Sequence, residues 1–139
     1  MGIDGSEPSR QALRWATEQA GLTGATVEAV GVWEYPATYA WGTVAVVDSA
    51  ELADACERNL VDTVAEVCGD QPSVTVDSEV VMGHPAYELV QHAKGADLLV
   101  VGSRGHGGFV GALLGSVGQY CVHHATCPVV VVRGEPTDA

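Results

Sequence analysis

The sequence predicts an α/β fold: a single doubly wound, five-stranded parallel sheet with helices on both faces. Apolar β-branched segments alternate with amphipathic segments in the order β-α-β-α-β-α-β-α-β, which is typical of a parallel sheet. The run Leu98–Val101 is continuously apolar, as in a strand buried on both faces. The chain of 139 residues is long enough for one domain with a core and too short for two. We therefore treat residues 1–139 as one domain.

The amino-terminal segment predicts the end of a strand at Ile3, then a turn and a helix. Ser6 can cap this helix, because the acid and the proline that follow it are favoured in a first helical turn. Small apolar residues at near-helical spacing continue to about Ala20. We expect Gly21 and Gly24 to end the helix there.

The middle of the chain predicts two strands separated by a long connection and a helix. Thr26–Trp33 is rich in valine and predicts a strand. Glu34–Ser49 is too long for a simple turn and carries three aromatic residues, so we expect a flap over one edge of the sheet. Ala50–Cys68 has an apolar stripe at helical spacing. Ser73–Val81 alternates polar and apolar residues, which predicts a half-buried edge strand.

The last third of the chain predicts two more helices and two more strands. A helix over Pro85–Ala93 precedes the buried run described above. After a glycine-rich loop, a further helix covers 116–124, and Ser116 is in position to be its N-cap. Val129–Val132 predicts the last strand, and the residues after Arg133 predict a solvated tail.

The glycine-rich loop between the buried strand and the next helix predicts an anion site. Gly102 is followed by five more glycines within fourteen residues. Glycine lets backbone N–H groups approach a phosphate closely, and the first turn of a helix offers unpaired N–H donors. Arg104 is the one fixed cation inside the loop and is a candidate phosphate contact; the alternative is that it faces solvent. For the loop itself, the alternative is a flexible connection.

Asp4 is a candidate ligand-binding residue because it follows a predicted strand and precedes a helix. In open α/β sheets, ligands bind at the carboxyl ends of the strands, near the point where the strand order reverses. The strands that end at Asp4 and Gly102 can be neighbours across that point. The alternative is that Asp4 only caps the first helix or its turn.

Composition excludes several classes of function. Eighteen acids against six bases give a formal charge of −12, which argues against a nucleic-acid partner because such binding needs Lys and Arg on phosphates. The chain has no apolar run of membrane-spanning length and no signal peptide. The four cysteines form no CxxC pair, which favours reduced thiols and a cytoplasmic location.

A cluster of cysteine and histidine residues near the carboxyl end could suggest a metal site. On a helix, however, Cys121 and His124 share a face while His123 points elsewhere, and Cys127 lies beyond the helix. We interpret the cluster as a packed cysteine with surface histidines, and expect no metal. The other histidines are interpreted as polar surface, and no catalytic residue is assigned.

Several motifs together resemble the universal stress protein family, ATP-binding type. The family's nucleotide signature, G-x2-G-x9-G-[ST], stands here as Gly102-Ser103-Arg104-Gly105, nine residues, then Gly115-Ser116. The opening Gly2-Ile3-Asp4-Gly5-Ser6, the turn Gly83-His84-Pro85-Ala86 and the final Cys127-Pro128-Val129-Val130-Val131-Val132 resemble further family segments. The resemblance covers essentially the whole chain.

The resemblance implies a Rossmann-like sheet in the order 3-2-1-4-5 and an adenine-nucleotide site. Asp4 and Val32 would contact the adenosine part, near the Gly102 backbone, and the loop and the following helix would hold ribose and phosphates. The ligand would be ATP, with magnesium bound through the phosphates. The implied site comprises Gly2, Asp4, Val32, Gly102, Ser103, Arg104, Gly105, Gly115, Ser116 and Val117.

The resemblance also implies a homodimer, because the last strand would otherwise leave an exposed apolar edge. That edge consists of Val129, Val130, Val131 and Val132. One departure concerns the first strand: only Gly2 and Ile3 follow Met1 before Asp4, where family members have several apolar residues. We expect either that the natural protein starts earlier or that this is a truncated version.

Three functions are compatible with these features. The first is a regulatory ATP-binding module, dimeric, that acts in stress response. The second is a slow ATP hydrolase or self-phosphorylating enzyme; the chain lacks a GxxxxGK[ST] loop and any acid inside the glycine loop, so efficient phosphoryl transfer is not expected. The third is a structural dimerisation domain with an empty pocket, which the intact glycine spacing argues against. A flavodoxin or receiver domain would need a different first loop or an acidic cluster with a lysine.

Overall fold

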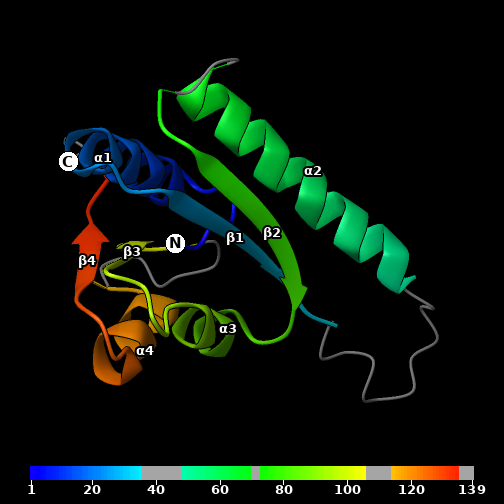
Figure 1. Cartoon of the computed structure of the whole chain (residues 1–139). Helices are drawn as coiled ribbons and strands as arrows, with labels where there is room; N and C mark the ends of the chain where they lie inside the picture. Colours follow the sequence, from blue (N-terminus) through cyan, green and yellow to red (C-terminus); the bar gives the residue numbers. More distant parts are fainter. Residues whose placement is uncertain (36–47, 70–72, 106–113, 135–139) are drawn as a thin grey trace, which may run out of the picture.

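The computed structural model describes residues 1–35, 48–69, 73–105 and 114–134. Helices and strands alternate along these residues (Figure 1), which confirms the predicted α/β class. The elements are α1 (Glu7–Thr23), β1 (Val27–Trp33), α2 (Ser49–Cys68), β2 (Val76–Met82), α3 (Pro85–His92), β3 (Leu99–Gly102), α4 (Ser116–His124) and β4 (Val129–Val132).

The described strands form two parallel pairs. β1 pairs with β2 from Val27↔Val76 to Trp33↔Met82, and β3 pairs with β4 from Leu99↔Val129 to Gly102↔Val132. The predicted order 3-2-1-4-5 counts the amino-terminal segment as strand 1. Its outer pairs, 3-2 and 4-5, therefore correspond to β2–β1 and β3–β4. Between them the amino-terminal segment contributes one parallel bridge, Gly2 to Val30, in place of a full central strand. The complete five-stranded order therefore stays a prediction.

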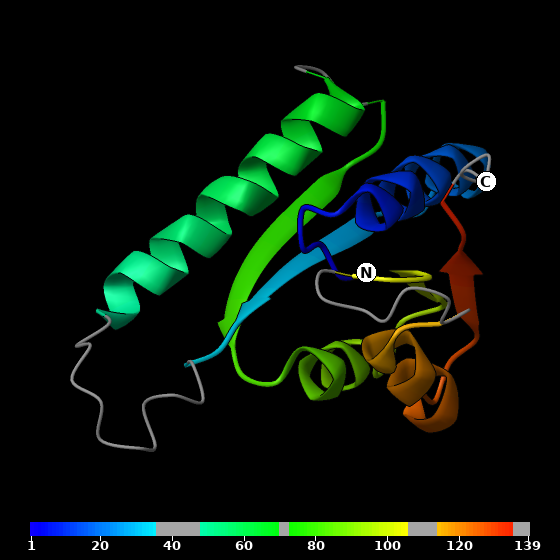
Figure 2. The same ribbon diagram turned by 180° about the vertical axis from the view of Figure 1, so that it is seen from behind.

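Helices cover both faces of the strands. α1 packs on α2 and on β3, while α3 packs on α4 and β1, and Figures 1 and 2 show these two helix layers on opposite sides of the strands. One core cluster, with Leu13 and Leu60 fully buried, lies under α1 and α2. A second, with Leu89 and Cys121, lies under α3 and α4. The doubly wound layering is therefore present around both strand pairs.

Helix ends follow local capping chemistry, with two corrections to the predictions. Ser6 caps α1 as predicted, because its side chain accepts the Ser9 N–H. Gly21 does not end the helix, which continues to Gly24, where the backbone turns left-handed with φ 75°. Ser116 is not the N-cap of α4: Gly115 occupies that position and Ser116 is the first helical residue. Glycine is itself one of the residues preferred at the N-cap position.

Some sequence predictions lie outside the described residues. The flap is one of these, except for Tyr35, whose ring packs edge-on against Trp33 with centroids 5.6 Å apart. The middle of the glycine loop, residues 106–113, is another, as is the tail at 135–139. Among the described helices, not one is both long and apolar enough to cross a membrane.

Candidate functional site

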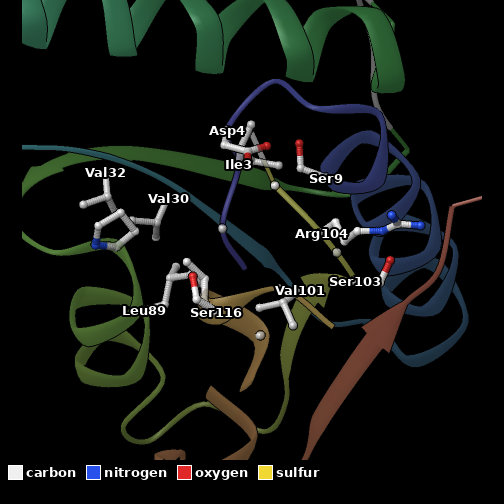
Figure 3. A pocket seen from close by; sticks show the side chains of 17 residues that line it. Ile3, Asp4, Ser9, Val30, Val32, Leu89, Val101, Ser103, Arg104 and Ser116 are labelled. Atoms are coloured by element: carbon white, nitrogen blue, oxygen red, sulfur yellow. The ribbon is translucent and has the colours of Figure 1, made fainter. Parts of the chain in front are cut away.

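A cavity of about 330 Å³ opens where β1, β3 and the starts of α3 and α4 converge on the amino-terminal segment (Figure 3). Seventeen residues line it. They include every residue predicted for the site: Gly2, Asp4, Val32, Gly102, Ser103, Arg104, Gly105, Gly115, Ser116 and Val117. Residues that are far apart in the sequence are therefore brought together at one cavity.

The cavity has an apolar wall and a polar wall. Val30 and Val32 lie together on one side in Figure 3, while Ser103 and Arg104 lie on the opposite side. The Arg104 side chain extends away from the two valines, so its backbone, rather than its guanidinium, faces the cavity. Such a site suits a ligand with an apolar ring at one end and hydrogen-bond acceptors at the other.

The two ends of the glycine loop are held together by backbone hydrogen bonds through Ser103. Its N–H donates to the Val132 oxygen at 2.8 Å, which extends the β3–β4 ladder, and its own oxygen accepts the Gly115 N–H at 2.7 Å. Ser103 is buried, with 6% of its surface exposed. The loop leaves β3 at Ser103, and its other end, Gly115, is hydrogen-bonded to Ser103 again. α4 therefore begins beside the end of β3.

The first turn of α4 presents N–H donors to this cavity. The first backbone bond of the helix runs from the Gln119 N–H to the Gly115 oxygen, at 2.9 Å. The N–H groups of the preceding residues have no partner one turn earlier inside the helix, as in any first helical turn. Those residues, Ser116, Val117 and Gly118, all line the cavity. An anion there would meet oriented donors and the positive end of the helix dipole.

Asp4 organises the turn before α1 and also reaches the cavity. Its Oδ1 accepts hydrogen bonds from the Ser6 N–H at 2.9 Å and from the Ser6 hydroxyl at 2.5 Å. Its Oδ2 would lie 2.5 Å from a Cβ added to Gly105. The predicted capping role is thus present in the structure, and it places the carboxylate against the glycine loop.

One glycine of the site is required by packing, whatever binds there. A Cβ on Gly102 would lie 2.8 Å from the carbonyl carbon of Pro8, a backbone atom. A Cβ on Gly2 would lie 2.7 Å from Leu89 Cδ1, the end of a side chain that can shift, and one on Gly115 would make only ordinary contacts, the nearest at 3.5 Å from the Arg104 Cα. Spatial need therefore explains Gly102 and leaves Gly115 available for another role.

Sequence reasoning missed seven residues that line the cavity. Ile3, Val30 and Val101 adjoin predicted residues, so strand continuity could have included them. Pro85 and Leu89 enter from α3, for which the GHPA turn was the available signal. The full set missed is Ile3, Ser9, Val30, Pro85, Leu89, Val101 and Gly118.

The cysteine and histidine cluster on α4 does not assemble as one site. Cys121 is fully buried, and this burial raises the pKa of its thiol. His123 and His124 are exposed, and the His124 ring lies against Tyr120 with centroids 4.2 Å apart. Within the described parts of the chain, no three His, Cys, Asp or Glu side chains are grouped to hold a metal ion.

Comparison with protein families and curated proteins gives one consistent result. A model described as "Universal stress protein family" matches residues 1–133. Universal stress protein Rv2005c of Mycobacterium tuberculosis is 38% identical over 138 residues, which covers 96% of this chain and 44% of that protein. Universal stress protein Rv2623 of the same organism is 34% identical over 133 residues, with the same coverages. The chain spans less than half the length of these relatives.

Solved structures with the same fold include nucleotide complexes. The hypothetical protein MJ0577 superposes with a TM-score of 0.81 at 22% identity, covering 98% of this chain and 94% of that one. A universal stress protein in complex with cAMP gives 0.62 at 23% identity (97% and 94% covered). The Archaeoglobus fulgidus universal stress protein in complex with dAMP gives 0.58 at 19% identity (94% and 93% covered). At these identities the likeness shows the fold.

Proposed function

The chain belongs to the universal stress protein family, and on that premise we propose that its cavity binds an adenine nucleotide and that the protein is a dimeric regulatory module in the response to stress. The observation that carries this proposal is the first turn of α4: its residues line the cavity beside the two ends of the glycine loop, which are hydrogen-bonded to each other, and its first N–H groups have no partner within the helix. The cAMP and dAMP complexes of proteins with this fold support an adenine nucleotide as the ligand class.

The adenosine part would lie against the apolar wall. Val30, Val32 and Leu89 offer flat aliphatic surface there, and Pro85 closes the side toward α3. Asp4 would accept a hydrogen bond from the nucleoside, since it lines the cavity and its carboxylate stands beside Gly105. A volume of about 330 Å³ fits a nucleoside-sized group, at the lower end of the range for ligand pockets.

The phosphates would lie over the start of α4. Gly105, Ser116 and Val117 would donate backbone N–H groups, and Ser116 would add its hydroxyl. The Gly115 N–H is bonded to Ser103, so Gly115 would contribute by leaving room for the phosphates beside its backbone. The chain carries a formal charge of −12, so these local donors would have to offset long-range repulsion of an anionic ligand. Arg104 would contribute its backbone first, and its side chain after rotation. We propose ATP as the ligand, with magnesium held by the phosphates.

Binding, rather than turnover, is the function that the site supports. Among the described residues lining the cavity, Asp4 is the single carboxylate, and its Oδ1 is already engaged by Ser6. Phosphoryl transfer needs a positioned base and usually metal-binding carboxylates. We therefore propose a nucleotide-dependent module without efficient catalysis.

The proposed homodimer would form through β4. Each residue of Val129–Val132 is only half-buried in the single chain, and its described hydrogen-bonding partner is β3 on one side. A second copy would cover the other edge, as proteins commonly do with exposed strands. The cysteines of the described residues are free thiols, in keeping with the cytoplasmic location that we propose.

Calorimetric titration of ATP with magnesium into the purified chain tests the proposed ligand, with AMP, cAMP and GTP titrated alongside. We expect saturable binding of the adenine nucleotides and much weaker binding of GTP. Absence of binding by every adenine nucleotide, in a sample shown by circular dichroism to be folded, would refute the proposal. Binding of AMP or cAMP in preference to ATP would keep the site and replace the ligand.

A further inference from the structure

The turn that leads from Asp4 into α1 lies between the candidate nucleotide cavity and α2. Figure 3 shows Asp4 on this turn at the edge of the cavity, with α2 beyond it. Gly5 adopts the left-handed conformation, with φ 81°, which side-chain-bearing residues rarely adopt. A Cβ on Gly5 would meet the side-chain amide of Asn59 on α2. The turn is therefore packed against α2 at Gly5, while Asp4 lines the cavity.

Arg10, in the first turn of α1, joins this turn to α2 with all three nitrogens of its guanidinium group. Its Nη1 donates to the Gly5 oxygen at 2.7 Å. Its Nε donates to Glu66 Oε2 at 3.0 Å, and Nη2 lies 3.0 Å from the same oxygen. Glu66 belongs to α2. One side chain of α1 therefore bridges the turn and α2.

The ion pair in this bridge matters for its geometry more than for its energy. The side chains of Arg10 and Glu66 are 27% and 58% exposed, and pairs that are this accessible to water stabilise a fold little. The carboxylate, however, orients the planar guanidinium group, whose remaining N–H then reaches the Gly5 oxygen. A hydrogen bond from a charged donor is stronger than a neutral one. The bridge therefore restrains the Gly5 peptide.

This restraint reaches the Asp4 carboxylate through Ser6. The N–H and the hydroxyl of Ser6 both donate to Asp4 Oδ1. The Ser6 oxygen is in turn held by α1, since it accepts the Ser9 hydroxyl at 2.9 Å and the Arg10 N–H at 3.1 Å. A rotation of the Gly5 peptide would move Ser6 relative to Asp4 and break this set of bonds. The position of the carboxylate therefore depends on the Gly5 peptide.

We propose that Arg10 is a positioning residue of the nucleotide site. By bridging the Gly5 oxygen and Glu66, it holds the Asp4 carboxylate where the nucleoside would meet it. α2 thereby sets the affinity of a cavity whose described lining includes no residue of α2. The effect on affinity rests on the proposed nucleotide function, whereas the effect on the turn rests on the hydrogen bonds alone.

Hydrogen exchange measured by NMR tests the effect on the turn in the chain without nucleotide. Arg10→Met removes every donor of the side chain, and Arg14→Met is the matched control. Arg14 carries the same charge on the same helix and pairs with Glu7 at 3.3 Å. We expect the Ser6 N–H to exchange at least about tenfold faster in Arg10→Met, relative to the N–H of the buried Ala16, and not in Arg14→Met. Unchanged exchange at Ser6 in Arg10→Met overturns the proposal, whether or not a nucleotide binds.

Calorimetric titration of ATP with magnesium, and of AMP, tests the effect on affinity. We expect Arg10→Met to weaken both ligands at least about fivefold and by the same factor, because the change acts through Asp4 and not on the phosphates. Loss of a distant positive charge would instead weaken ATP more than AMP, and Arg14→Met would share that loss. Equal effects of the two arginine variants therefore overturn the proposal.

A double-mutant cycle shows whether Arg10 acts through Asp4. In a chain with Asp4→Ala, adding Arg10→Met should lower the affinity no further, because the carboxylate that it positions is gone. An equal loss in the Asp4→Ala chain and in the unaltered chain overturns the positioning role. If the unaltered chain binds no adenine nucleotide, the proposed function fails and the effect on affinity fails with it. The exchange of the Ser6 N–H then decides separately whether Arg10 holds the turn.

Discussion

The two adjoining cavities of this protein are built in different ways. The candidate nucleotide cavity is bounded by a loop whose ends meet at Ser103 and by the start of a helix. A second cavity, lined by Val30, Leu89 and Val100 among others, lies between β1 and β3; it is about three times larger, and its long sides are strand edges. Hydrogen bonds within a short stretch of chain join the two loop ends at the first, whereas the second lies between β1 and β3, which belong to different strand pairs. The first cavity is therefore shaped by the ends of one loop, and the second by the arrangement of the strands.

The largest expected effect is on the candidate nucleotide cavity. Ser116→Glu places a negative charge at the first residue of α4, and Gly115→Val adds a branched side chain beside the backbone that a phosphate must approach. We expect each to weaken nucleotide binding at least about a hundredfold, or about 2.7 kcal/mol. Calorimetry measures the affinity, and Ser78→Glu, exposed on β2, adds the same charge outside the cavity as a control. Unchanged affinity in both loop variants would remove α4 from the proposed site.

A smaller effect separates glycines needed for packing from those needed for a ligand. Gly102→Ala should lower the free energy of unfolding by about 1–3 kcal/mol, because its Cβ would meet the Pro8 backbone at 2.8 Å. Gly115→Ala should change stability by less than about 1 kcal/mol in either direction, because its φ of −69° suits any residue while alanine is a poorer N-cap than glycine. Urea denaturation measures both. Equal losses in the two variants would contradict the distinction.

The loop part of the candidate nucleotide cavity could be predicted because Gly102–Gly105 and Gly115–Val117 stand at either end of one short loop, whereas Gly2 and Val32 were predicted only through the family resemblance. Gly102 and Gly115 flank a loop between a buried strand and a helix, so their sequence separation already implies that they share a site. The capping chemistry of Ser6 likewise places the start of α1. The Ser116 prediction was wrong by one position because both it and Gly115 can fill an N-cap.

The remainder depended on tertiary contacts that no short pattern encodes. Leu89 reaches the cavity because α3 packs under β1, which the periodicity of α3 does not reveal. The larger cavity between β1 and β3 was not predicted. Its existence depends on how β1 and β3 are spaced by other elements. Sequence reasoning therefore identified the glycine motif from Gly102 to Ser116 and missed the cavity between β1 and β3.

The wall shared by Val30 and Leu89 has a thermodynamic consequence. A ligand that displaces either side chain changes the shape of both cavities at once, because the same atoms face each of them. Binding at one cavity would then alter affinity at the other by some factor, and linkage requires that the factor be identical in both directions. In that case, a ligand in either cavity would change the affinity for a ligand in the other by the same factor, although different features of the fold form the two cavities.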